Sequence, residues 1–397
     1  MTMHDRAARI LSPDVETAVE QRNAFVIGQA FNRSGSAVAI ILGDGSVVVA
    51  GDRGLQPLAE AQTIPLDGLP LSLAPDVDGE GLVVGTDAGA VLVVSADGNV
   101  SEIHRFPGRW IQIVASHAGT HLRVAASGRE IEVFDGAGCH QRTVSGHPSS
   151  VSGMAFSPDG TRLAVSHYNG VSIWDLTDPS PSPTQLQWKG SQTGVSWSPD
   201  GRYLVTSTQE NELHCWNLDQ NRDMRMSGYP SKVRAMSWCP NASYLAVAGA
   251  DVVTSWSFEG GGPEGKPPLE FGYVFEGTVT CVAAHPFEKS VAGGYSDGTV
   301  LIGDIASGDA IIAKAPSGGA VTAIAWSPDG SILFAGTEQG EIARIRVVGR
   351  VSGRRDAAEQ AFINAGAGTT APETAPLISD CGSTECTADE AGSGTAS

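Results

Sequence analysis

A tight turn that recurs at nearly constant intervals constrains this 397-residue chain more than any other feature. At eight places a turn rich in Gly, Asn or Asp separates two short apolar runs, which is typical of a β-hairpin. The interval of 39 to 47 residues leaves room for four short strands and their turns. We therefore expect one small sheet copied along the chain, with hairpin turns at Gly45, Gly89, Gly128, Gly170, Asn211, Asp251, Gly298 and Gly340.

The clearest copy lies between Gly146 and Asp175. Its first apolar run ends at the turn Ser157-Pro158-Asp159-Gly160, and its second ends at Asn169-Gly170, the dipeptide best suited to a two-residue hairpin turn. The same Ser-Pro-Asp-Gly turn returns at 198–201 and 327–330. One such sheet cannot bury its faces alone, so the copies must pack on one another. The pattern predicts an all-β fold, a β-propeller of four-stranded antiparallel blades, with eight blades.

Two dipeptides of this copy, Gly146-His147 and Trp174-Asp175, resemble the signature of the WD-repeat β-propeller family. The resemblance covers about Phe25 to Val347. Seven blades are the commonest number in that family, so seven is the alternative count. The resemblance also implies a hydrogen-bonded chain inside the blade, formed by His147, Ser166, Asn169 and Trp174.

The repeats divide the chain into three parts. Residues 1–22 form a polar leader, and a segment near Thr17 to Asn23 could supply the strand that closes the ring. Residues 23–350 form the propeller. Residues 351–397 are rich in Ala, Gly, Ser, Thr and acidic residues. Such a composition cannot bury enough apolar surface to offset its ordering entropy, so we expect a disordered tail.

Charge and cysteine usage limit the class of protein. The formal net charge of −19 argues against binding to nucleic acid or to anionic lipid, because both depend on Lys and Arg. The six cysteines do not resemble a disulfide framework: four are scattered singly, and Cys381 and Cys386 lie close enough to pair locally or to contribute to a metal site. The N-terminus lacks the apolar core of a signal peptide. We expect a monomeric cytoplasmic protein, and the excess of Arg over Lys favours a bacterial source.

No set of catalytic residues stands out, and we predict no enzyme activity and no cofactor. The sequence has no nucleophile elbow between a strand and a helix and no phosphate-binding loop. His117 and His121 share one turn, with His140 as a third candidate ligand, but a zinc site needs three or four ligands. Two alternatives remain, a hydrolase or lyase in the central channel and a metal-responsive binder that uses Cys381 and Cys386.

Recognition of a protein or peptide is the function that the fold favours. The loops that enter each first strand, and the hairpin turns before each third strand, meet on one face of such a propeller. Aromatic and Arg side chains dominate interface energetics, and basic groups favour an acidic partner. The candidate contact residues on these loops are Arg109, Trp110, Tyr168, Tyr229, Lys232, Arg234 and Tyr295. We expect the repeated tryptophans (Trp174, Trp197, Trp216, Trp238, Trp256 and Trp326) to be structural instead.

Overall fold

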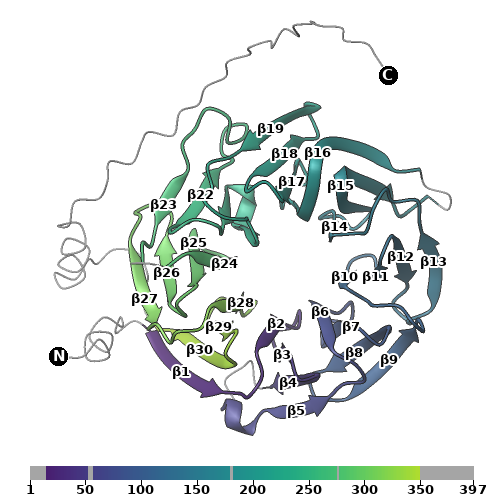
Figure 1. Ribbon diagram of the computed structural model, residues 1–397, viewed down its shortest axis with the longest axis horizontal. Helices are drawn as coiled ribbons and strands as arrows, with labels where there is room; N and C mark the ends of the chain where they lie inside the picture. The colour runs from purple at the N-terminus through teal and green to yellow at the C-terminus, as the bar shows by residue number, and fades with distance from the viewer. Residues whose placement is uncertain (1–14, 52–56, 179–181, 275–276, 349–397) are drawn as a thin grey trace, which may run out of the picture.

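The chain folds into a ring of small antiparallel sheets (Figure 1). The computed structural model describes residues 15–51, 57–178, 182–274 and 277–348. Apart from two short 3-10 turns, η2 (Leu58–Glu60) and η3 (Pro240–Ala242), every element in these ranges is a β-strand. None of these elements is a helix long and apolar enough to cross a membrane. The first fourteen residues and the predicted tail, including Cys381 and Cys386, lie outside the described residues.

Six of the sheets have four strands each. The first is β2 (Val26–Phe31), β3 (Val38–Leu42), β4 (Ser46–Ala50) and β5 (Gln62–Pro65). The second is β6 (Pro70–Pro75), β7 (Gly81–Thr86), β8 (Ala90–Ser95) and β9 (Val100–Arg105). The third is β10 (Ile113–His117), β11 (Leu122–Ser127), β12 (Glu130–Phe134) and β13 (His140–Val144). Farther along the ring are β20 (Met236–Trp238), β21 (Tyr244–Val247), β22 (Val253–Ser257) and β23 (Leu269–Phe271). They are followed by β24 (Val279–Ala284), β25 (Ser290–Tyr295), β26 (Val300–Asp304) and β27 (Ala310–Lys314). The last is β28 (Val321–Trp326), β29 (Ile332–Thr337), β30 (Glu341–Val347) and β1 (Val15–Gln21).

The remaining sheet has six strands: β14 (Gly153–Phe156), β15 (Arg162–Asp175), β16 (Thr184–Trp197), β17 (Tyr203–Thr208), β18 (Leu213–Asn217) and β19 (Arg222–Met226). Strand β15 reverses at Asn169 and Gly170, and at its ends the Leu176 amide donates to the Thr161 carbonyl over 2.8 Å. Strand β16 pairs first with β15 and then with β17. This sheet therefore holds the fourth and fifth repeat units. Counted by sheets the propeller has seven blades, and the eight sequence repeats fit because two share one sheet.

The two ends of the described chain meet in one sheet. Strand β1 pairs with β30 in antiparallel register from Val15 opposite Val347 to Gln21 opposite Glu341. The two strands lie side by side in Figure 1. A second link joins the last sheet to the first one, where the Thr322 hydroxyl of β28 donates to the Val26 carbonyl of β2 over 2.7 Å. The ring is thus closed by hydrogen bonds between segments more than 290 residues apart.

Neighbouring sheets pack through apolar clusters that include the repeated tryptophans. All six are buried or half-buried. The Trp197 indole donates to the Ala155 carbonyl over 3.0 Å, and the Trp326 indole donates to the Ala283 carbonyl over 3.1 Å. Each of these bonds joins the first strand of one unit to the first strand of the unit before it. These two indoles therefore tie adjacent repeat units together, the structural role predicted for the repeated tryptophans.

Candidate partner-binding face

The strand order divides the loops between two faces of the ring. Successive strands run antiparallel and each repeat unit has four, so every loop that links one unit to the next emerges on the same face. The turns between second and third strands emerge there too. We call this the linker face. The turns between first and second strands, including the Ser-Pro-Asp-Gly turns, lie on the opposite face.

Exposed aromatic side chains gather on the linker face. The described residues contain five aromatic side chains that are largely exposed, and four of them lie on the linker face, three in its loops and Tyr168 at the reversal of β15. Trp110 is 66 % exposed and Tyr168 is 54 % exposed, as expected for partner contacts. Phe25 and Tyr273 join them, and Phe287 alone lies on the opposite face. Sequence reasoning missed Phe25 and Tyr273, although each stands in a loop that enters a first strand and so carried the same positional signal.

Two of the predicted basic residues are available on this face. Lys232 and Arg234 are both exposed in the loop between β19 and β20. Val233 between them is buried, and its packing holds this part of the loop, with the two charged side chains, against the protein. No carboxylate of the described residues lies within salt-bridge distance of either side chain. Their charges can therefore act on a partner.

Arg109 forms ion pairs with two glutamates of its own chain and is only partly exposed. Its guanidinium donates to Glu132 over 2.7 Å and forms a second ion pair with Glu130. Glu132 is buried, and its other oxygen accepts from the Thr143 hydroxyl at 2.6 Å and from His140 Nε2 at 2.9 Å. Burial disfavours the charged form of Glu132, but hydrogen bonds from Thr143, His140 and Arg109 outweigh it and lower the pKa of Glu132. Arg109 therefore balances a buried charge.

Tyr229 and Tyr295 are buried, so their prediction as partner contacts is wrong. The Tyr229 hydroxyl accepts a hydrogen bond from the Trp256 indole at 2.6 Å. The Tyr295 hydroxyl donates to the Gly272 carbonyl. Burial raises the pKa of both phenols. Both rings fill space between strands, and only their backbones belong to the linker face.

The hydrogen-bonded chain implied by the family resemblance is present only in part. The Trp174 indole donates directly to His147 Nε2 over 3.0 Å. Ser166 does not take part, because His147 Nδ1 bonds to the Arg129 carbonyl instead, and the Ser166 hydroxyl lies 3.2 Å from the Ser152 hydroxyl. Asn169 does not take part either, since its side-chain oxygen accepts from the Gly190 amide at 3.2 Å. The prediction is therefore wrong for Ser166 and Asn169.

The histidines considered as metal ligands have other roles. His117 Nδ1 accepts from the Thr120 amide at 3.2 Å, and its Nε2 donates to the Pro158 carbonyl at 3.2 Å. No lone pair of His117 remains for a metal ion. His121 is exposed, and His140 is bound to Glu132. No group of three metal-ligating side chains occurs in the part of the chain that the structure describes.

The cysteines of the described residues are unpaired thiols, and three of them are buried. Burial raises the pKa of Cys239 and of Cys281 to about 12, and it also raises the pKa of Cys215. A thiol reacts and binds metal as the thiolate, which burial disfavours here. These three cysteines therefore act as small apolar side chains in the core.

Comparison with known proteins agrees with the fold. The family profile "WD domain, G-beta repeat" matches residues 138–175, 184–217, 269–304 and 312–342. The B-type cell cycle switch protein ccs52B of Medicago truncatula is 25% identical over 232 residues, which are 55% of this chain and 45% of the relative. The transcriptional corepressor LEUNIG_HOMOLOG of Arabidopsis thaliana is 27% identical over 148 residues, 36% of this chain and 18% of the relative. The chain thus spans less than half the length of these relatives.

Solved structures show the same architecture. A chain from the crystal structure of the mitotic checkpoint complex superimposes with a TM-score of 0.59 at 19% identity, over 70% of this chain and 86% of that one. At that identity the likeness concerns the fold alone. The ring of four-stranded repeat units, the blade with its His147–Trp174 bond and the four matched segments together lead to one conclusion. The chain belongs to the WD40-repeat β-propeller family.

Proposed function

We propose that this protein is a non-catalytic platform that binds a protein or peptide partner through its linker face. The observation that carries the proposal is the uneven distribution of exposed aromatic side chains, four of five on that face. Large exposed aromatic rings are unfavourable in water and dominate binding energy when a partner covers them. The loops that present them are held by rigid sheets, which reduces the ordering cost of binding.

The exposed side chains also define the partner's chemistry. Trp110 and Tyr168 offer flat apolar surfaces, and Lys232 and Arg234 offer charges that no described residue neutralises. A segment with an apolar side chain followed by carboxylates complements both groups. The solved chain of similar fold comes from a multi-protein assembly, the mitotic checkpoint complex. Unpaired cysteines in the described residues support a reducing compartment, so we place the protein in the cytoplasm.

Affinity capture with linker-face variants tests this function. The tagged full chain is used to capture partners from a lysate of the source organism, and recovered proteins are quantified against the bait. We expect a stoichiometric partner whose recovery falls at least about tenfold with the double substitution Trp110→Ala and Arg234→Ala. Arg202→Ala, a change at an exposed residue of the opposite face, is the control and should leave recovery unchanged. Equal recovery by all three baits would refute the proposed face.

A further inference from the structure

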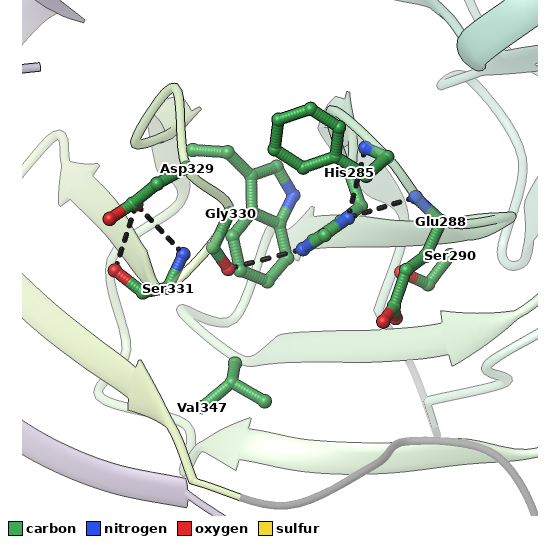
Figure 2. A pocket seen from close by; sticks show the side chains of 9 residues that line it. His285, Glu288, Ser290, Asp329, Gly330, Ser331 and Val347 are labelled. Atoms are coloured by element: carbon green, nitrogen blue, oxygen red, sulfur yellow. Dashed lines mark hydrogen bonds between the residues drawn. The ribbon is translucent and has the colours of Figure 1, made fainter.

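A second candidate site lies on the opposite face, where the turn after β24 meets the turn after β28 (Figure 2). It is a pocket of about 280 Å³ between the last two sheets of the ring. Small-molecule sites usually measure about 300–1,000 Å³, so this pocket is the size for one long side chain. Its lining includes His285, Phe287, Glu288, Trp326, Asp329 and Val347.

The aromatic walls of this pocket are held in place before anything binds. The Trp326 ring is fixed by the bond from its indole to the Ala283 carbonyl, and the His285 ring packs against it at 4.9 Å, nearly perpendicular. His285 Nδ1 accepts from the backbone amides of Phe287 and Glu288, and its Nε2 donates to the Gly330 carbonyl at 3.1 Å. Phe287 itself is 69 % exposed. The Trp326 ring therefore offers aromatic surface at a fixed position, and the exposed Phe287 ring lies at the same pocket.

The charge around the pocket is negative. Glu288 and Asp329 are exposed and line it from two different sheets. The nearest lysine in sequence, Lys289, is paired with Glu259 at 2.8 Å and lies over the Tyr244 ring, so its charge is used elsewhere. The protein as a whole carries a net charge of −19, which attracts cations.

We propose that this pocket binds the cationic side chain of an arginine or lysine in a partner peptide. The aromatic faces of Phe287 and Trp326 favour a cation above them, and the Glu288 carboxylate pairs with its charge. This site is separate from the linker face and requires a different chemistry, a basic side chain instead of acidic and apolar ones. A partner that reaches both faces would gain affinity from two independent contacts.

Titration followed by NMR tests the site in the full chain. The indole N–H signal of Trp326, assigned with Trp326→Phe, reports binding of Nα-acetyl-arginine amide or Nα-acetyl-lysine amide. We expect a saturable shift with a Kd of roughly 1–10 mM, as suits a single side chain. Nα-acetyl-citrulline amide has nearly the shape of the arginine probe without its charge, and it should bind at least about fivefold more weakly. No saturable shift, or equal binding of citrulline, would overturn the proposal.

Matched variants test whether the charge of Glu288 and the position of the pocket matter for binding. Glu288→Gln should weaken binding of the arginine probe about fivefold, whereas Glu210→Gln, the same charge change on the linker face, should not. Trp110→Ala should also leave binding unchanged, which keeps this test independent of the proposed function.

A further variant tests whether the chain's own arginines occupy the pocket, with Arg350, Arg354 and Arg355 replaced together by Gln. A shift of the Trp326 signal without any probe would identify the chain's own segment as the occupant and overturn the partner proposal.

Discussion

The indole of Trp174 donates a hydrogen bond to Nε2 of His147 over 3.0 Å, and this bond fixes a buried imidazole in its neutral form. An indole N–H can only donate, so Nε2 must carry the lone pair. His147 Nδ1 then donates to the Arg129 carbonyl over 2.8 Å. A second proton on the ring would place two donors against each other inside the blade. Burial accordingly lowers the pKa of His147, and also that of the nearby His167.

Stability should therefore fall as the pH drops from 7 to 5. The unfolded chain takes up a proton on each histidine near pH 6.5, whereas the folded state resists protonation of His147. The stabilisation is present above pH 6.5 and is lost as the pH falls through the lowered pKa. Urea midpoints at the two pH values measure it. We expect a smaller difference for His147→Gln, and an unchanged one for the exposed His121→Asn. An identical pH dependence in His147→Gln would contradict this account.

Replacing Arg123 should destabilise the fold more than replacing any surface arginine. Its guanidinium makes two bonds to Asp76, at 2.5 and 2.8 Å, and Asp76 is completely buried. Arg123→Met leaves that carboxylate without its counter-charge, which costs about 3–5 kcal/mol of the free energy of unfolding. Arg202 pairs with Asp219 at the surface, so Arg202→Met should cost only about 0–1 kcal/mol. Chemical denaturation of both variants measures the contrast, and equal losses would disprove it.

Replacing Gly160 by alanine should lower the stability of the fold more than replacing Gly201, although both glycines occupy the same turn position. Their φ angles are +71° and +72°, so each substitution carries the backbone strain of the left-handed region, about 1 kcal/mol. A Cβ at Gly160 would also collide with the His117 ring of the neighbouring unit. At Gly201 the nearest atom is Pro158 Cδ at 3.7 Å, an ordinary contact. Thermal unfolding should rank the wild type above Gly201→Ala and Gly201→Ala above Gly160→Ala. The reverse order of the variants would show that the His117 contact is unimportant.

Removal of the closing strand should weaken the whole ring. Deleting residues 1–21 removes β1 and leaves the β30 edge, with its unpaired backbone groups, exposed. We expect a lower urea midpoint and association of the chains in size-exclusion chromatography. Deleting residues 1–14 retains every residue of β1 and serves as the control. If the two deletions behave alike, pairing of β1 with β30 does not contribute to stability.

The architecture could be predicted from sequence because it depends on local signals. Gly, Asn and Asp at the hairpin turns are needed wherever the chain reverses, and their spacing counts the units directly. The number of sheets was harder to predict from the sequence. Strands β15 and β16 run through positions where other units have a break, so the fourth and fifth units merge. That merger depends on hydrogen bonding across the sheet and leaves no simple mark in the sequence.

The candidate site was harder to predict because side-chain direction is set by distant neighbours. Tyr229 and Tyr168 both belong to the linker face, yet the Tyr229 ring is buried, with its hydroxyl accepting a hydrogen bond from the Trp256 indole, whereas Tyr168 is exposed. The sequence around Arg109 suggests an exposed basic residue, because its buried partner, Glu132, lies 23 positions later in the chain. Trp110, next to Arg109, makes no hydrogen bond or ring contact with any described residue and is exposed. The sequence therefore predicted which residues lie on the linker face, but not which of their side chains are exposed.

The shared sheet of β1 and β30 has a consequence for a chain that is cut. The first and last strands are hydrogen-bonded to each other in one sheet. A single protease cut in a loop elsewhere in the ring therefore gives two fragments that stay bound through that sheet and through the packing of adjacent blades. A nicked ring should therefore migrate as one particle under native conditions and as two bands in denaturant. Fragments produced separately should reassemble when mixed, which would make this propeller a natural candidate for split-protein reporters.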